Sequence, residues 1–317
     1  MERVLTARSR LPQSQAGIGV LLGFVAYGLW GLFPLYFHML GDVSPVEVVA
    51  NRVVWSLVLL VIITLVTRTW SSTIAAARSR RNVTTLAIAA AFLALNWGVY
   101  VWAVASNQVV EASLGYFINP LVSVGLGVLV LRERLRTGQW VAVGIAVLAV
   151  AVLTFSYGRL PWISLILAFS FGIYGLLKKQ VGVGAVESLT IETAALAPLA
   201  LIVMFAFARS GDSALASGDP KTTMLLVLLG PVTAIPLLAF GGAATRIPLS
   251  TLGLMQYFTP VFQFLIGVFV FGEAMSPSRW LGFLLVWISL MVMSIDGLRN
   301  AHNGRTRADD LEVIAPD

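Results

Sequence analysis

Long apolar stretches separated by short polar segments dominate the chain. Each stretch is close to the twenty residues that a helix needs to cross a hydrocarbon core about 30 Å thick. The stretches are apolar on all sides, whereas the strands of a membrane barrel alternate apolar and polar residues over about ten positions. The pattern therefore predicts an all-α integral membrane protein with ten transmembrane helices, at Gly17–Leu40, Val46–Thr67, Val83–Ala105, Ser113–Leu131, Gln139–Tyr157, Leu160–Leu177, Glu187–Ala208, Thr222–Ala244, Ser250–Phe271 and Arg279–Gly297.

The first apolar stretch differs from a cleaved signal peptide. Arg3, Arg8 and Arg10 precede it, as they would a signal sequence. Its apolar run from Gly17 to Leu40 is much longer than the 7–15 residues of a signal core, and no small-residue cleavage site ends it. We therefore expect it to stay in place as the first transmembrane helix.

The composition agrees with a membrane protein and excludes several other classes. Of the 317 residues, 58% are hydrophobic and only 11% are charged, against about 25% in soluble proteins. No cysteine is present, which excludes disulfides, thiolate zinc sites and a cysteine nucleophile. The histidines, His38 and His302, are too few for a His-rich metal site, so we expect no metal and no cofactor. The net charge of +6 is spread between apolar stretches, so we expect no nucleic-acid partner.

The basic residues predict the orientation in the membrane. Sixteen of the 21 Lys and Arg residues fall in the N-terminal segment 1–16, the even-numbered loops and the tail 298–317, and four fall on the opposite side. Cytoplasmic loops carry the excess of Lys and Arg, so both termini are predicted to be cytoplasmic. The tail has too little apolar surface to fold alone, and we expect it to be disordered. The one remaining basic residue, Arg52, lies inside a predicted helix.

The chain also contains an internal repeat. The segment Leu114–Trp140 resembles Leu254–Trp280 at an offset of 140 residues. Two halves of five helices each, 17–158 and 159–297, follow from this offset. Because five is odd, the second half must enter the membrane from the opposite side, as in the inverted repeats of secondary transporters. The matched pairs are Pro120 and Pro260, Gly127 and Gly267, Glu133 and Glu273, Trp140 and Trp280, and Glu47 and Glu187.

Several short motifs resemble one family of membrane proteins. The run from Glu111 to Leu121 is similar to the fourth-helix signature of RarD-type proteins, in the EamA branch of the drug/metabolite transporter superfamily. The resemblance implies ten helices, two EamA-like repeats and the transport of small solutes across a bacterial inner membrane. Arg132 departs from the family, in which Gly commonly precedes the acidic residue. The supporting motifs are Tyr27–Gly31, Arg52–Ser56, Asn96-Trp97, Ile191–Thr193, Ala243–Arg246 and Leu249–Gly253.

Two ionisable residues inside predicted helices are the first candidates for function, because such groups are costly in a membrane. Arg52 and Glu192 occupy equivalent repeat positions. Their helices start from opposite faces, which places them at levels roughly 12 Å apart. We therefore expect separate roles: Arg52 contacts polar or anionic groups of the solute, and Glu192 takes up a proton or cation. The alternatives are a snorkelling Arg52 and a Glu192 that only caps its helix.

Aromatic residues around one amide form the second candidate group. Asn96 and Trp97 lie mid-span in the third predicted helix, too deep for an interfacial aromatic belt. Such a wall suits a planar, partly polar solute, whereas the alternative makes Asn96 a hydrogen-bonding link between helices. The wall also includes Tyr100, Tyr27, Trp30 and Tyr174.

Polar residues next to prolines form the third group. Asn119 precedes Pro120, and Gln256 precedes Pro260 by four residues. A proline frees a main-chain carbonyl, which a nearby polar group or the solute can bind; a purely structural kink is the alternative. Tyr116 joins this group as a predicted solute contact. Glu133, beside Arg132 and Arg134, is instead expected to be a structural ion partner.

Together these features favour a secondary transporter that works by alternating access on a small polar or aromatic solute. The expected partners are the solute, membrane lipid and protons. The sequence is compatible with a proton-coupled carrier and with an uncoupled facilitator, and it does not predict the oligomeric state. Export is favoured by the resemblance alone. No phosphate-binding P-loop sequence occurs. A non-transporting scaffold is the alternative, and a membrane-embedded enzyme a weaker one, since no H-E-x-x-H or G-x-S-x-G sequence is present.

Overall fold

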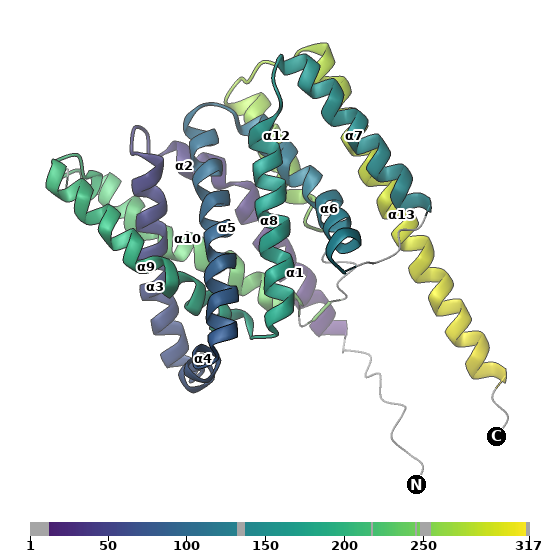
Figure 1. Cartoon of the computed structure of the whole chain (residues 1–317), viewed down its shortest axis with the longest axis horizontal. Coiled ribbons are helices and arrows are strands. Elements are labelled where there is room, and N and C mark those ends of the chain that lie inside the picture. Colours follow the sequence, from purple (N-terminus) through teal and green to yellow (C-terminus); the bar gives the residue numbers. More distant parts are fainter. Residues whose placement is uncertain (1–12, 132–136, 217, 245, 248–254, 315–317) are drawn as a thin grey trace, which may run out of the picture. The chain divides into compact units, whose positions relative to one another are not determined.

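The computed structural model describes residues 13–131, 137–216, 218–244, 246–247 and 255–314, and every regular element among them is a helix. Figure 1 shows their arrangement. The elements are α1 (Gln13–Gly31), α2 (Phe33–His38), α3 (Pro45–Val66), α4 (Trp70–Ala77), α5 (Arg80–Ala105), α6 (Val109–Leu131), α7 (Thr137–Tyr157), α8 (Trp162–Val181), α9 (Ala185–Ser210), the 3-10 turn η1 (Ala214–Ala216), α10 (Pro220–Ala244), α12 (Phe258–Leu265), the π-helical turn η2 (Ile266–Val270) and α13 (Pro277–Ile314).

The prediction of an α-helical membrane protein is confirmed. Among the described residues, seven helical segments are long and apolar enough to cross a membrane: Gln15–His38, Pro45–Val66, Arg80–Ala105, Thr137–Tyr157, Ala185–Ser210, Pro220–Phe240 and Pro277–Asp296. Three shorter apolar helical segments accompany them, at Val109–Val122, Trp162–Lys178 and Phe258–Val270. Each predicted stretch overlaps one of these segments, while the count of ten spans stays a prediction.

The structure differs from the expected elements in three places. The first predicted helix is divided into α1 and α2 at Leu32, because Pro34 has no N–H to continue the hydrogen-bond ladder. A short helix, α4, which the apolar pattern did not predict, lies in the loop between the second and third predicted spans. The last helix, α13, continues to Ile314, so the predicted disordered tail is helical up to that residue. Extending an existing helix is far easier than starting one, since nucleation is the costly step.

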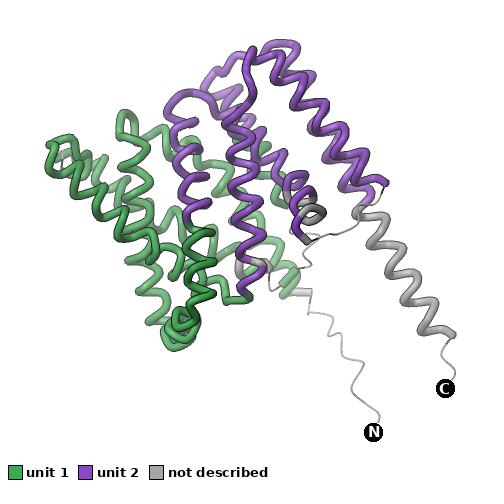
Figure 2. The backbone as a smooth tube through the Cα atoms, in the orientation of Figure 1, with its two compact units in different colours: residues 1–90, 182–263 green, residues 91–181, 264–317 purple. Residues whose placement is uncertain are grey.

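The described helices divide into two compact units, coloured in Figure 2. Unit 1 contains residues 1–90 and 182–263, and unit 2 contains residues 91–181 and 264–317. Within unit 1, α3 packs against α9 and α10, and α1 packs against α10. Within unit 2, α6 packs against α8, and α7 lies beside α13 (Figure 1). Each of these pairs joins a helix from the first half of the chain to one from the second.

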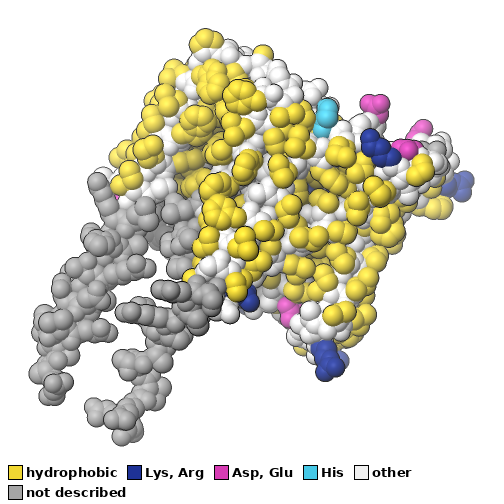
Figure 3. Space-filling view, turned by 180° about the vertical axis from the view of Figure 1, so that it is seen from behind, with side chains coloured by type: hydrophobic (Ala, Val, Ile, Leu, Met, Phe, Trp, Pro, Cys, Tyr) yellow, Lys and Arg dark blue, Asp and Glu magenta, His cyan; other side chains and the backbone are white. Residues whose placement is uncertain are grey.

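Hydrophobic side chains cover most of the face shown in Figure 3, and the charged side chains lie toward its edges. Many large apolar side chains are exposed on the surface of the protein. Phe155, Val66 and Phe269 keep 87%, 76% and 74% of their surface accessible. Soluble monomers rarely expose so much apolar surface in continuous patches. These side chains are suited to contact with lipid tails.

Candidate functional site

Two charged side chains are buried in the helices of unit 1. Arg52 on α3 is 4% exposed and Glu192 on α9 is 1% exposed. The helices that carry them pack directly against each other. Arg52 therefore does not snorkel to the surface, and Glu192 lies inside α9 rather than at its first turn, where Glu187 stands. Both positions match the expectation that these residues are held inside the molecule.

The surroundings of Arg52 are aromatic. Its guanidinium carbon lies 5.4 Å from the ring centre of Phe33 and 5.8 Å from that of Phe37, both on α2. At these distances the negative ring faces attract a cation. The break between α1 and α2 thus turns two apolar side chains toward a buried charge. The sequence did not single out Phe33 and Phe37, because their contact with Arg52 depends on the packing of α2 against α3.

Buried hydroxyl groups lie on α3 and on α10, which packs against it. Ser56 follows Arg52 by one turn of α3 and is 1% exposed, and Thr233 on α10 is 2% exposed. Neither hydroxyl oxygen has a hydrogen-bond partner within the described part of the chain. Close helix packing isolates them: a Cβ at Gly230 of α10 would lie 2.6 Å from the carbonyl oxygen of Trp55 on α3. Buried polar groups are nearly always satisfied by protein, water or ligand, so these hydroxyls are available to a bound molecule.

Two acidic residues link the ends of α3 and α9 in a reciprocal way. Glu47 in the first turn of α3 accepts hydrogen bonds from the amide of Ala214, at 2.9 Å, and the hydroxyl of Ser213, at 3.1 Å, just after α9. Glu187 in the first turn of α9 accepts one from Ser72 of α4, just after α3, at 2.9 Å. The two glutamates are 140 residues apart. The pair holds the two helices antiparallel.

The predicted aromatic residues of α1 belong to unit 1. Tyr27 and Trp30 pack edge-to-face at 5.5 Å, and both contact Phe240 of α10, at 6.1 and 5.9 Å. Tyr27 also joins a buried apolar cluster with Met255. Gln256 lies in a half-buried turn just before α12. Tyr27 therefore contributes to the core, with its neighbours on α10.

Two carbonyls near the α1–α2 break accept hydrogen bonds from residues that the sequence did not suggest. Pro34 cannot donate to the carbonyl of Trp30, and Gln263 of α12 supplies that donor at 3.2 Å. Thr259, one turn earlier on α12, donates to the carbonyl of Tyr27 at 2.9 Å. A proline four residues after a carbonyl, with a glutamine in an apolar helix, is a pattern that could have indicated Gln263.

In unit 2, Asn96 links three helices. Its amide nitrogen on α5 donates to the carbonyl of Leu167 and the hydroxyl of Ser170 on α8, both at 3.0 Å. The hydroxyl of Tyr116 on α6 donates to its amide oxygen at 3.2 Å. Asn96 is 1% exposed. These contacts match the helix-linking alternative for Asn96, and they fix the position of Tyr116.

The aromatic residues of unit 2 form a connected row. Tyr116 is 5.7 Å from Tyr100 and 6.5 Å from Phe171, and Phe171 is 5.8 Å from Tyr174. Lys178 donates to the hydroxyl of Tyr174 at 2.7 Å and lies 5.1 Å from its ring centre. The structure thus brings together three predicted residues, Tyr100, Tyr116 and Tyr174. The sequence missed Phe171 and Lys178, which lie three residues before and four residues after Tyr174.

Two further predicted residues are buried in unit 2. Trp97 is 7% exposed, and Asn119 is 9% exposed. Asn119 precedes Pro120, which lies inside α6 as expected. A Cβ at Gly172 of α8 would lie 3.7 Å from the side-chain oxygen of Asn119, so the glycine allows α6 and α8 to approach each other there. Glu133 lies outside the described residues.

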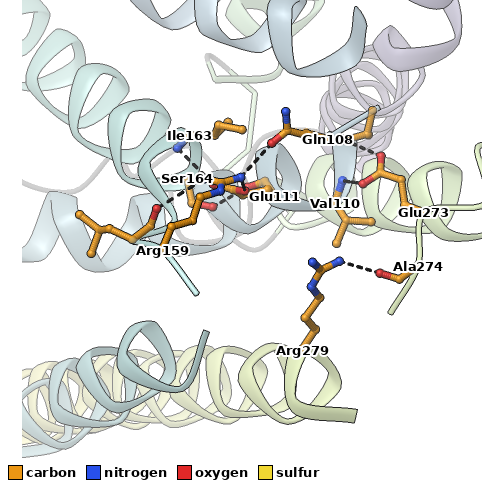
Figure 4. Close-up of polar contacts among 11 residues, drawn as sticks. Gln108, Val110, Glu111, Arg159, Ile163, Ser164, Glu273, Ala274 and Arg279 are labelled. Atoms are coloured by element: carbon orange, nitrogen blue, oxygen red, sulfur yellow. Dashed lines mark hydrogen bonds and ion pairs between the residues drawn. The ribbon is translucent and has the colours of Figure 1, made fainter. Parts of the chain in front are cut away.

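A charged cluster that the sequence did not assign lies at one end of unit 2 (Figure 4). Glu111, in the first turn of α6 and 2% exposed, forms an ion pair with Arg159 at 2.8 Å. Its carboxylate also accepts the amide of Ile163 in α8, at 3.3 Å. Arg159 donates in addition to the side chain of Gln108 at 2.9 Å. Although Glu111 begins the motif that indicated the family, its role depends on Arg159, 48 residues away.

A second acid in this cluster caps a helix. Glu273 accepts the amides of Val109 and Val110, at 2.5 and 3.0 Å, at the start of α6. Burial raises the pKa of Glu273 above its ordinary value, while the two amides lower it. The contact joins the segment after η2 to α6. Glu273 was expected only as the repeat equivalent of Glu133.

An arginine and a tyrosine complete the cluster. The guanidinium carbon of Arg279, in the first turn of α13, lies 4.3 Å from the ring centre of Tyr157 at the end of α7. Its side chain donates to the carbonyl of Ala274 at 2.7 Å. These residues border a cavity of about 270 Å³. Within the described ranges, no group of three or more His, Asp or Glu side chains is placed to hold a metal ion.

Comparison with known proteins adds a family to this geometry. The sequence model of the EamA-like transporter family matches residues 17–155. The chain is 50% identical to Protein RarD of Streptomyces exfoliatus over 304 residues, which cover 96% of each chain. It is 40% identical to Protein RarD of Escherichia coli (strain K12), covering 88% of this chain and 95% of the relative.

A more distant relative and a solved structure agree. The chain is 32% identical to the Chloramphenicol-sensitive protein RarD of Pseudomonas aeruginosa, over 90% of this chain and 96% of that one. A solved crystal structure with 20% sequence identity superposes with a TM-score of 0.59, covering 87% of this chain and 97% of its own, which supports the fold. Because its relatives match almost end to end, the chain belongs to the RarD-type proteins of the EamA-like transporter family.

Proposed function

We propose that the protein is a secondary transporter that moves a small polar or aromatic solute across the inner membrane by alternating access, with export the favoured direction. Its EamA and RarD relatives indicate a membrane transporter of the drug/metabolite superfamily. The names of those relatives do not specify a solute for this chain. The solute class therefore rests on the side chains buried inside each unit.

The observation that carries the proposal is the burial of Arg52 and Glu192 in adjacent membrane helices. A charged side chain in the middle of a membrane span costs several kcal/mol, and such residues commonly mark pathways for substrates or ions. Arg52 is held by Phe33 and Phe37 on one side and is followed by the buried hydroxyl of Ser56. In the proposal, Arg52 contacts polar groups of the solute and Glu192 is the site for a coupling proton.

The aromatic residues of unit 2 support the proposal that the solute is aromatic. Tyr100, Tyr116 and Tyr174, with Phe171, present connected ring faces and edges in unit 2. Asn96 is assigned a positioning role, because its hydrogen bond fixes the hydroxyl of Tyr116. Ligand pockets combine apolar and aromatic walls with a few oriented polar groups, which is the composition seen here.

The proposed transport cycle rests on an inverted repeat. The reciprocal contacts of Glu47 and Glu187, which are equivalent at the offset of 140, support such a repeat, because each ties its own helix to the end of the other. The excess of basic residues in the even-numbered loops supports cytoplasmic termini. Rocking of two repeats around a central site is the usual form of alternating access.

The proposal is tested by transport in proteoliposomes that contain the purified full-length protein. We would screen aromatic antibiotics, amino acids and nucleosides under a pH gradient, with empty vesicles as the blank. Glu192→Gln should abolish the response of the flux to the gradient. Asp212→Asn is the control, because it removes an exposed carboxylate just after α9, and its flux should stay close to that of the wild type.

Two outcomes would contradict the proposal. If no solute class showed gradient-dependent flux, the protein would not be a carrier for these solutes. If Glu192→Gln changed neither the flux nor its pH dependence, Glu192 would not be the proton site. The absence of cysteine allows a further check. A single cysteine at position 52, 96 or 192 should react with water-soluble reagents, and failure of all three to react would exclude water-accessible sites there.

A further inference from the structure

The charged cluster of unit 2 surrounds a cavity that the proposed transport site does not use. Its volume is about 270 Å³, and it is bordered by the end of α7, the start of α6 and the start of α13. The residues that matter here are Glu111, Tyr157, Arg159, Glu273, Ala274 and Arg279. The volume is at the lower end for ligand pockets, which suits a small molecule rather than a drug-sized one.

Both carboxylates at this cavity already have donors. Glu111 receives Arg159 and the amide of Ile163. Glu273 receives the amides of Val109 and Val110. In Figure 4 the side chains of Arg159 and Gln108 converge near Glu111, while Glu273 points toward Val110. Glu111 is thus paired with a cation, whereas the partners of Glu273 are neutral amides, and Arg279 is the cation that acts on Glu273 electrostatically.

Arg279 is the charged group with unused capacity. A guanidinium has five N–H donors, and one hydrogen bond, to the carbonyl of Ala274, is made by Arg279 among the described residues. Its Nε atom is buried and has no hydrogen-bond partner within the same residues. The ring of Tyr157, at 4.3 Å, holds the guanidinium plane in place without using its donors. The ion pair that the described structure shows at this cavity is that of Arg159, not Arg279.

We propose that this cavity binds the carboxylate of a small organic anion, with Arg279 as the anion contact and Tyr157 as its support. A planar guanidinium matches a carboxylate in shape and can bind it through two parallel hydrogen bonds. The inference concerns binding alone and does not depend on the transport cycle. It is therefore tested without measuring flux.

The experiment uses the full-length protein in detergent with one introduced cysteine. Ala274→Cys places a thiol at the cavity in a chain that has no other cysteine. The rate of its reaction with N-ethylmaleimide is measured against increasing benzoate, a small carboxylate. Benzamide, which has the same ring and no charge, is the control ligand. Inorganic phosphate tests whether any oxyanion is accepted.

Benzoate should slow the reaction in a saturable way, and benzamide should not. Adding Arg279→Gln to the cysteine variant should raise the benzoate concentration needed for half-protection by about tenfold or more, because a charge-assisted hydrogen bond is lost. Arg279→Lys keeps the charge but not the planar pair of donors, so it should give an intermediate value. Arg209→Gln removes an exposed arginine of α9 and should leave protection unchanged.

Three results would overturn the inference. Equal protection by benzoate and benzamide would show that charge is not recognised. Protection that is unchanged in both Arg279 variants would show that the anion binds elsewhere. A lack of protection by benzoate would exclude a carboxylate site, and this includes the case in which phosphate protects the cysteine and benzoate does not. Because Arg279→Lys retains the cation over Tyr157, it reports on binding even if Arg279→Gln fails to fold.

Discussion

The side-chain amide of Gln263 donates to the main-chain carbonyl of Trp30 at 3.2 Å, where Pro34 leaves that carbonyl without its helical donor. The helix break and its repair therefore lie on different segments, α1–α2 and α12. In a membrane, a carbonyl without a donor costs more than in water, because no solvent replaces the lost bond. The break can persist because α12 satisfies it, and the break in turn directs Phe33 and Phe37 toward Arg52.

Replacing Gln263 tests this relationship. We expect Gln263→Leu to lower the free energy of unfolding by ~1–3 kcal/mol, since the Trp30 carbonyl loses its donor. Pro34→Ala restores an N–H that can bond the same carbonyl, so Gln263→Leu should cost less in that background. The measurement is a double-mutant cycle of detergent-solubilised protein, followed by thermal or chemical unfolding. Equal costs in the two backgrounds would contradict the repair.

Two glycines on α6 form a matched pair for helix packing. A Cβ at Gly115 would lie 2.8 Å from the carbonyl oxygen of Ser164 and 2.9 Å from the Cβ of Leu167, both on α8. Gly115→Ala should therefore destabilise the protein by ~1–3 kcal/mol. A Cβ at Gly125 would have no atom within 4 Å, so Gly125→Ala should stabilise α6 by up to ~1 kcal/mol. Unfolding temperatures of the two variants should move in opposite directions.

The buried carboxyl of Glu273 predicts a pH dependence of stability. Burial raises its pKa in the folded protein above the ordinary value of 4.5. The folded state therefore binds this proton more readily than the unfolded state, and the resulting stabilisation is present below pH 4.5 and is lost as the pH rises through the folded pKa. Relative to Glu273→Gln, the wild type should lose stability as the pH rises above 4.5. The unfolding temperature of the wild type minus that of Glu273→Gln should therefore fall as the pH rises. A rise in this difference with pH would contradict the prediction.

The aromatic surroundings of Arg52 predict that lysine cannot replace it. Lysine keeps the charge but lacks the planar guanidinium that lies over Phe33 and Phe37. We expect Arg52→Lys to lower kcat/KM for the transported solute by roughly twofold to thirtyfold, the range of a cation–π contact. Arg209→Lys, an exposed exchange on α9, is the control. Equal transport by wild type and Arg52→Lys would remove Arg52 as a solute contact.

The apolar stretches were sufficient to predict the helical membrane architecture, because a span must satisfy its own backbone. They located the core of each long helix, such as Pro45–Val66, to within a few residues. They did not predict α4, because Trp70–Ala77 is short and largely exposed, and its position depends on packing against α9. Nor did they place the end of α13, since no single residue near Gly297 stops a helix that is already formed.

The sequence indicated which polar residues would be buried, but it did not indicate their contacts. Arg52, Glu192 and Asn96 could be chosen because buried polar groups are conspicuous in an apolar sequence, and all three are buried. The partners of these residues could not be chosen from the sequence. Phe33 and Phe37 look like any other apolar residues until the packing of α2 brings them close to Arg52 on α3. Likewise Glu111 meets Arg159 only after α6 and α8 have packed, and sequence spacing gives no measure of that distance.

The pairing of helices across the two halves of the chain has a consequence for membrane insertion during synthesis. α7 packs chiefly against α13, which is made after all the other described helices, and α3 packs against α9. The buried carboxylate of Glu47 receives its donors only when Ser213 and Ala214 have been made. The first five apolar segments therefore enter the bilayer before their partners exist. Fragments 1–158 and 159–317 should each be degraded when expressed alone and should survive when expressed together. The helices of the first half would then pack fully only after the second half has been synthesised.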